Sequence, residues 1–368
     1  MKRRAFFGTA FAFAAASPSF GQPRRGRWDD AVAVLDRAVA AGQVDAAVLH
    51  VVHQDESFTR HFGRAGSDDA MFLLGSISKP IAVTAVMTLF DRGSFQLDDR
   101  VKKFLPAFAG EGRDEVTIRH LLTHVSGLPD QVAHNAELRR QHAALTEFAE
   151  HAIRARLDFA PGTRYQYSSM GILLAARIAE IISELDILTL VERNVLQPLG
   201  MRHSAQGLGP FKLEEMISCQ RKGASPESGG GDPQAKDWDW NSPYWRKLGA
   251  PWGGTHASAP DLATFLGDFM GARGQVVKPE TARLMIKNHN PEGFTPRGLG
   301  FAVGKVACSP GCSEQTFGHG GSTGTLCWAD PASETICVVL TSLPRPAGAE
   351  HHPRELAAER VAAAARKE

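Results

Sequence analysis

Ser76-Ile77-Ser78-Lys79-Pro80 opens the clearest helical pattern in the sequence, with apolar residues recurring along one side as far as Leu89. Proline is tolerated in the first turn of a helix, where its missing N–H costs least. Gly93 stands just past the pattern and can end the helix. The pattern therefore predicts a helix over residues 76–91 that begins at Ser76.

This helix start has the residue types of a nucleophile and its base. A serine hydroxyl is a weak nucleophile until a base takes its proton. Positions i and i+3 of a helix are neighbours, so the Lys79 amine can reach the Ser76 oxygen if burial or neighbouring cations keep the amine partly neutral. The N–H groups at the helix start can hold an oxyanion. Alternatively, Ser76 caps the helix and Lys79 is a surface residue. This alternative stays open because the S-x-x-K spacing by itself is a weak signal.

A second stretch, residues 161–169, ends in Tyr165-Gln166-Tyr167-Ser168-Ser169 and directly precedes a strong helical pattern over 170–184. A tyrosine phenol can relay protons if a cation lowers its pKa, and Lys79 would be that cation. The alternative is that Tyr165 and Tyr167 are ordinary half-buried aromatic residues.

A third stretch, Gly318-His319-Gly320-Gly321-Ser322-Thr323-Gly324, lies between two predicted late strands. Its glycines would let a substrate lie against a strand edge. His319 would supply a polar contact that titrates near neutrality. The alternative is a glycine-rich hairpin with a solvated histidine.

Strand patterns occur at both ends of the chain, and the middle is helical. A helix is expected over 29–41, strands over 46–53 and 58–64, and further strands over 300–306, 314–318, 325–329 and 335–341, before a final helix over 353–366. Helices and loops dominate from about 97 to 254, with helices expected over 116–124 and 145–156, and another helix is expected over 261–269. We therefore expect one α/β (α+β) domain, with an α/β lobe from about 28–96 and 255–368 and a helical lobe from about 97–254.

In this order, the three stretches resemble the motifs of the serine β-lactamase and penicillin-binding protein family, in particular its class C branch with the related esterases and D-aminopeptidases. Residues 121–129, 253–255 and 261–263 also look familial, and the resemblance covers about 28–345. It implies the β-lactamase/transpeptidase-like fold, in which helices flank an antiparallel sheet built from both chain ends and a helical lobe is inserted.

The resemblance also implies roles for the site residues. Ser76 would be acylated, Lys79 and Tyr167 would share the proton transfers, and the backbone N–H groups of Ser76 and Ser322 would form the oxyanion hole. His319 would contact the substrate's polar end or Tyr167. Substrate-binding positions are expected at Ser169, Gly320 and Gly321. Apart from the resemblance, Trp252 ends a tryptophan-rich stretch whose loops could wall the cleft, so a substrate contact is expected there too, with ordinary packing as the alternative. Members of this family need no metal or organic cofactor.

Two positions depart from the family pattern. Ser169 replaces the asparagine that contacts the lysine and the substrate amide, so recognition of amides is in doubt more than nucleophilicity is. His319 stands where true β-lactamases have lysine, which favours an esterase or a peptidase-like enzyme over efficient β-lactam hydrolysis.

Residues 320–324 also fit G-x-S-x-G, the nucleophile elbow of α/β-hydrolases, with Ser322 as nucleophile. That motif needs a helix after the serine. A strand is expected here, which disfavours the elbow.

The first residues predict export. Lys2, Arg3 and Arg4 precede a short apolar run, and small residues before Gln22 suit a signal peptidase, so residues 1–21 are expected to be a signal peptide. The double arginine partly matches the twin-arginine signal, and a periplasmic location is expected. An uncleaved anchor is the alternative; no other segment is apolar and long enough to span a bilayer.

Five cysteines are too few for a disulfide scaffold. We expect buried, small apolar side chains first. Cys308 could bridge Cys312 across a tight turn, and Cys327 could face Cys337 across two neighbouring strands.

Charge is balanced, with 41 Lys and Arg against 40 Asp and Glu, which gives no reason to expect nucleic acid as a partner. The sequence thus predicts an exported serine hydrolase that forms an acyl-enzyme at Ser76 with a small ester, amide or peptide substrate. Alternatives are a weak or inactive cell-wall or ligand-binding member of the same fold, or a D-aminopeptidase or β-lactam hydrolase. The oligomeric state is not predicted.

Overall fold

The computed structural model describes residues 26–222, 224–225, 228–230, 232–307, 309–345 and 351–366. The predicted signal peptide and its cleavage site lie outside these residues, and so does Cys308 of the first possible bridge.

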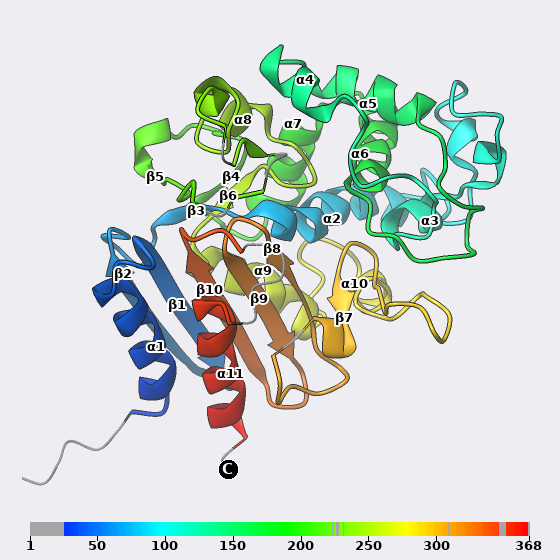
Figure 1. The fold of residues 1–368 in the computed structure, drawn as a ribbon. Helices are drawn as coiled ribbons and strands as arrows, with labels where there is room; N and C mark the ends of the chain where they lie inside the picture. Colours follow the sequence, from blue (N-terminus) through cyan, green and yellow to red (C-terminus); the bar gives the residue numbers. More distant parts are fainter. Residues whose placement is uncertain are drawn as a thin grey trace, which may run out of the picture.

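The larger sheet is antiparallel and is built from both chain ends. Its strand order is β2-β1-β10-β9-β8-β7. The amino-terminal hairpin β1–β2 thus joins the carboxyl-terminal strands through the pair β1–β10 (Figure 1). The bounds of its strands are β1 Ala46–His53, β2 Glu56–Gly63, β7 Ala302–Val303, β8 Phe317–Gly321, β9 Thr325–Asp330 and β10 Thr335–Thr341.

Both faces of this sheet are covered. Helices α1 (Asp29–Ala40) and α11 (Pro353–Ala365) pack together on one face, and α9 (Ala259–Met270) packs on the other (Figure 1). Along β1, Leu49 and Val51 belong to the core under α1 and α11, whereas Val48 belongs to the main core. Burial on both faces explains why β1 reads as an almost unbroken apolar run instead of an alternating one.

A second, small sheet was not predicted. It has the order β4-β6-β3-β5, and its strands are two or three residues long. They are β3 Met71–Leu73, β4 Ser204–Gln206, β5 Met216–Ile217 and β6 Thr255–Ala257. Runs this short carry no readable periodicity, and two of them fall within the range predicted as helical.

The helical region above the larger sheet surrounds α2 (Ser78–Asp91), which is preceded by a 3₁₀ turn, η1 (Gly75–Ile77) (Figure 1). Helix α2 is buried along most of its length and packs against α6 (Ser169–Ser183). The other helices are α3 Ile118–Leu122, α4 Asn135–Arg140, α5 Leu145–Arg154, α7 Ile187–Val191, α8 Pro243–Leu248 and α10 Pro279–Met285.

The predicted pairing of Cys327 with Cys337 is wrong. Cys327 is opposite Val338 in the β9–β10 register, and Cys337 is opposite Trp328. Because neighbours along a strand point to opposite faces, the two thiols lie on opposite sides of the sheet, Cys327 in the main core and Cys337 in the core under α1 and α11. Both cysteines are free.

Candidate active site

Ser76 is the middle residue of the 3₁₀ turn η1, and this turn follows strand β3 and Leu74. The chain enters the turn through Gly75, whose φ is +56°. A Cβ at Gly75 would lie 2.9 Å from the hydroxyl oxygen of Thr323, so only glycine permits this approach to the β8–β9 turn. Ser76 is partly exposed, so its hydroxyl can be reached from outside.

Lys79 lies one turn further along, and its side chain is fully buried. Its Nζ is 3.0 Å from the Ser76 Oγ and 2.9 Å from the main-chain oxygen of Trp252. The structure thus brings the predicted nucleophile and base into direct contact.

Burial lowers the pKa of Lys79 to about 7. Loss of hydration disfavours the ammonium form, and the nearby Arg297 lowers the pKa further, whereas Asp130 raises it. A large fraction of the amine is therefore neutral near pH 7 and has a free lone pair, as a general base requires.

Tyr167 lies beside this pair, with the Lys79 Nζ 4.8 Å from its ring centroid. The prediction that Lys79 brings the pKa of this phenol below its ordinary value is wrong. Burial raises the pKa of Tyr167 well above its ordinary value, and the interactions with Ser76 and Arg297 offset this only in part. The hydroxyl is buried and meets no full hydrogen-bond geometry among the described residues, although its interaction with the Ser76 side chain lowers its pKa. Tyr167 therefore stays protonated and can donate a proton, while Lys79 is the group able to accept one.

The residues after Tyr167 start α6. The Ser168 side chain caps the helix by accepting from the Gly171 N–H at 3.0 Å. Ser169 is 3% exposed, and its N–H donates to the Asp130 carboxylate at 2.8 Å. The carboxylate of Asp130 is exposed at this position.

His319 lies within strand β8, not in a connection between strands as predicted. Its Nδ1 is 2.8 Å from the Gly320 oxygen, and its Nε2 is 3.5 Å from the Arg297 Nη1. The prediction that His319 titrates near neutrality is also wrong. Burial, Arg297 and Lys79 hold its pKa well below the ordinary value, so its imidazole is neutral at physiological pH.

The turn after β8 carries Ser322, whose backbone N–H has no partner among the described residues. Two hydroxyl groups tie this turn to the segment before Ser76: Thr323 Oγ1 donates to the Leu73 oxygen and Thr325 Oγ1 donates to the Leu74 oxygen, both at 2.6 Å. Strand β9 follows Ser322, so the strand-to-helix geometry of a nucleophile elbow is not present there.

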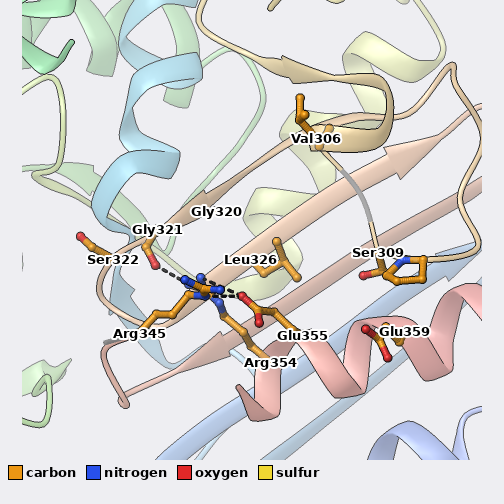
Figure 2. Close-up of a pocket in the computed structure, with 12 residues that line it drawn as sticks. Val306, Ser309, Gly320, Gly321, Ser322, Leu326, Arg345, Arg354, Glu355 and Glu359 are labelled. Atoms are coloured by element: carbon orange, nitrogen blue, oxygen red, sulfur yellow. Dashed lines mark hydrogen bonds and ion pairs between the residues drawn. The ribbon is translucent and has the colours of Figure 1, made fainter. Parts of the chain in front are cut away.

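A cavity of about 530 Å³ adjoins this turn on the side of α11 (Figure 2). Gly320, Gly321 and Ser322 form part of its wall. Arg354 reaches from α11 and donates to the Gly321 oxygen and, at 2.7 Å, to the Thr325 oxygen (Figure 2 shows the first bond). The carboxyl-terminal helix thus supports the turn from behind.

Trp252 contacts the site through its main chain. Its side chain is 4% exposed and packs against Phe148 and Trp245, whereas its carbonyl oxygen binds the Lys79 amine. The predicted substrate contact of Trp252 stays a prediction.

Sequence reasoning missed two charged groups of the site, Asp130 and Arg297. Arg297 donates from Nε to the Tyr165 hydroxyl at 3.0 Å and lies over the rings of Tyr165 and Tyr167. It forms no ion pair with any described residue. Neither residue belongs to a motif, and both reach the site from loops, so nothing in the local sequence indicated them.

This fold and this arrangement of serine, lysine and tyrosine define a class of serine hydrolases with the β-lactamase fold. A model of the family named Beta-lactamase matches residues 31–362, so the chain belongs to that family. The predicted fold and the predicted family are confirmed.

Two relatives of the chain carry the names of enzymes that act on esters or on peptides. Esterase EstB of Burkholderia gladioli is 33% identical over 193 residues, which cover 46% of this chain and 49% of EstB. A protein of Escherichia coli K12 that is provisionally named a D-alanyl-D-alanine carboxypeptidase is 26% identical, covering 74% of this chain and 69% of that protein. The crystal structure of a penicillin-binding protein homologue from Caulobacter crescentus superimposes with a TM-score of 0.75 at 20% identity, covering 92% of this chain and 97% of that one.

Within the described residues, no group of three or more His, Cys, Asp or Glu side chains could hold a metal ion. None of the described helices is long and apolar enough to cross a membrane.

Proposed function

We propose that this protein is an exported serine hydrolase that cleaves a small ester or amide through an acyl-enzyme at Ser76. The observation that carries the proposal is the 3.0 Å contact between the Ser76 hydroxyl and a fully buried lysine amine whose pKa is about 7. A lysine in this state can activate a serine at neutral pH without a histidine.

In the acylation step, the neutral Lys79 amine takes the Ser76 proton while Oγ bonds to the substrate carbonyl carbon. The carbonyl oxygen becomes an oxyanion, which the backbone N–H groups of Ser76 and Ser322 stabilise. The bond to the leaving group then breaks. The Tyr167 phenol gives its proton to the leaving oxygen or nitrogen, and the Lys79 ammonium returns a proton to the phenol.

In the deacylation step, a water molecule attacks the acyl carbon and Lys79 takes the proton of the water. The tetrahedral intermediate releases the Ser76 oxygen, which recovers its proton from Lys79. The carboxylic acid leaves, and every group returns to its starting protonation state.

Ester substrates are favoured over amides by two residues. Ser169 has a short hydroxyl in place of the carboxamide that binds the substrate amide in family members with asparagine. His319 is neutral, so it lacks the charge of the lysine that true β-lactamases carry there. EstB is named an esterase, which agrees with this preference.

The test uses two serine variants and a small activated ester. We expect Ser76→Ala to abolish turnover and Ser322→Ala to retain part of it, since Ser322 contributes its backbone and not its hydroxyl. Equal loss in both variants would contradict the assignment. A fluorophosphonate or penicillin probe separates an enzyme from a binding protein of the same fold, because a binding protein would form no adduct at Ser76.

A second candidate activity is removal of a carboxyl-terminal residue from a peptide. Arg297 favours it, since a half-buried guanidinium without an ion-pair partner among the described residues can bind a carboxylate. One relative is provisionally named a D-alanyl-D-alanine carboxypeptidase. A panel of esters, D-amino amides, D-alanyl-D-alanine peptides and nitrocefin decides between the activities.

Export to the periplasm is proposed from the first 21 residues alone. Mass spectrometry of the protein from its host would find Gln22 at the amino terminus if the signal peptide is cleaved where expected. Changing both Arg3 and Arg4 to lysine would keep the protein in the cytoplasm if the twin-arginine route is used, and unchanged export would indicate another route.

A further inference from the structure

His124 occupies an unusual position directly after α3. Its φ is +63°, in the left-handed region that is uncommon for residues other than glycine and that asparagine, aspartate and histidine adopt more often than the rest, and its side chain is fully buried. Sequence analysis gives it no catalytic role, and it does not touch Ser76 or Lys79 through any hydrogen bond.

Both the main chain and the side chain of His124 hold the stretch that carries Tyr167. The His124 carbonyl oxygen accepts from the Gln166 N–H at 3.0 Å. Its Nδ1 accepts from the Ser168 N–H at 3.2 Å. The residues immediately before and after Tyr167, Gln166 and Ser168, are thus both bound to one residue that lies 42 and 44 positions earlier in the chain.

The imidazole ring also packs directly on the phenol ring. The centroids of His124 and Tyr167 are 4.5 Å apart with an interplanar angle of 37°, and Tyr165 meets the imidazole edge-on at 6.2 Å. The Tyr167 ring therefore contacts His124 as well as the Lys79 amine.

Only one protonation state of His124 fits these contacts. Because Nδ1 accepts a hydrogen bond, the ring proton is on Nε2. Burial and the nearby charges of Arg297 and Lys79 hold the pKa of His124 well below the ordinary value, which keeps the ring neutral.

A purely structural role accounts for only one of the two ring nitrogens, because Nδ1 binds the Ser168 N–H whereas Nε2 binds no described residue. The His124 Nε2 is buried and has no hydrogen-bond partner among the described residues. An unsatisfied buried donor costs about 1–3 kcal/mol. An apolar ring would avoid the cost at Nε2 but would leave the buried Ser168 N–H without its acceptor, so the two effects oppose each other and stability alone does not decide for or against a histidine.

We infer that His124 is a positioning residue that sets the Tyr167 phenol against Ser76 and Lys79. This inference rests on the proposed function, since it assumes that Tyr167 transfers a proton to the leaving group. His124 itself touches neither substrate nor the reacting atoms. It fixes the main chain on both sides of Tyr167 and restricts the tilt of its ring.

The decisive variant is His124→Asn. Asparagine tolerates the left-handed conformation, and its Oδ1 lies where Nδ1 of histidine lies, so the backbone and the bond to Ser168 survive and only the ring contact is lost. We expect kcat to fall by about 10- to 100-fold with KM nearly unchanged, since a misplacement of about 1 Å costs up to about 100-fold.

A double-mutant cycle with Tyr167→Phe tests whether His124 acts through the phenol. In the Tyr167→Phe background, adding His124→Asn should reduce kcat by less than about threefold, as expected for residues that act as a unit. Independent, multiplicative losses would overturn the inference, and so would an unchanged kcat in His124→Asn itself.

Ser126→Ala is the matched control from the same turn, because the hydrogen bond of the Ser126 hydroxyl among the described residues is the one it accepts from the Leu128 N–H at 3.2 Å, away from the Tyr167 stretch. It should lower the melting temperature without changing kcat. A crystal structure of His124→Asn adds a readout independent of turnover. An undisturbed Tyr167 ring in that structure would refute the positioning role even if Ser76 proved unreactive. Failure of the covalent probe to label Ser76 in the wild-type protein would refute only the proposed function.

Discussion

The Lys79 amine donates to the Trp252 carbonyl oxygen at 2.9 Å, and this contact orients the amine that we propose as the base. A neutral amine has two hydrogens and one lone pair. With one hydrogen held by Trp252, the lone pair can be directed at the Ser76 oxygen 3.0 Å away, where it would accept the serine proton in the proposed mechanism. The tryptophan therefore serves the site through its main chain.

The first prediction concerns pH. Because the base must be neutral and the pKa of Lys79 is about 7, kcat/KM should rise with pH through a midpoint near 7 and then level off. His319, whose pKa lies well below the ordinary value, should contribute no midpoint near neutrality. Initial rates with an activated ester between pH 5 and 9 measure this profile.

Removing the base provides the control for that profile. Lys79→Ala should lower kcat by about 10²- to 10⁴-fold, the range for loss of a general base. A midpoint near 7 that persisted in the residual activity of this variant would show that another group titrates.

The second prediction concerns the two charges that sequence reasoning missed. Arg297 lowers the pKa of Lys79 and Asp130 raises it. Arg297→Gln should therefore move the midpoint of the pH profile to higher pH, and Asp130→Asn should move it to lower pH. Each variant is the control for the other, and shifts in the same direction would contradict the electrostatic account.

The third prediction concerns Ser169. Replacing it with asparagine restores the carboxamide of the family motif and offers a hydrogen bond to a substrate amide. We expect the ratio of amide to ester turnover to rise by about five- to tenfold, which corresponds to one net hydrogen bond of about 1 kcal/mol. Ser169→Ala should leave the ratio near its wild-type value. The measurement is kcat/KM for an amide and an ester with the same acyl group.

The fourth prediction separates two adjacent glycines in β8. A Cβ at Gly321 would lie 2.1 Å from the Leu74 oxygen, whereas a Cβ at Gly320 would meet nothing closer than 3.8 Å. Gly321→Ala should therefore lower the free energy of unfolding by about 1–3 kcal/mol and reduce activity, as overpacking does. Gly320→Ala should stay close to the wild type in thermal or urea unfolding. A stable Gly321→Ala variant would show that the β8 edge can move away from Leu74.

Much of the fold was predictable because its main helices and strands have long, regular patterns of apolar residues. The helix predicted over 29–41 is α1, the strand over 46–53 is β1, and the helix over 170–184 is α6, each within a residue or so of its bounds. The strand predicted over 300–306 was too long: only Ala302–Val303 pairs, and a 3₁₀ turn follows at Gly304–Val306. Tertiary pairing determines such short strands, so they leave no local pattern.

Contacts within a motif were predictable, and electrostatics across the site was not. The i, i+3 spacing was enough to place Lys79 next to Ser76, although the helix predicted from Ser76 begins at Ser78 and Ser76 lies in the preceding 3₁₀ turn. The pKa of Tyr167 and of His319 depends on burial and on Arg297, a loop residue distant in sequence from both. Loss of hydration outweighed the neighbouring positive charge at Tyr167, which reversed the expected direction of its pKa.

The pairing of the amino-terminal strand β1 with the carboxyl-terminal strand β10 has a consequence for biosynthesis. The Ala46 N–H donates to the Ser342 hydroxyl, 296 positions further along the chain, and β1 pairs with β10 along its whole length. When the hairpin β1–β2 emerges from the ribosome, the edge of β1 that will pair with β10 is open. That edge stays unpaired until nearly the entire polypeptide has been made. Such distant pairing slows folding and exposes an apolar edge to aggregation, so the nascent chain should depend on chaperones until its last strand arrives.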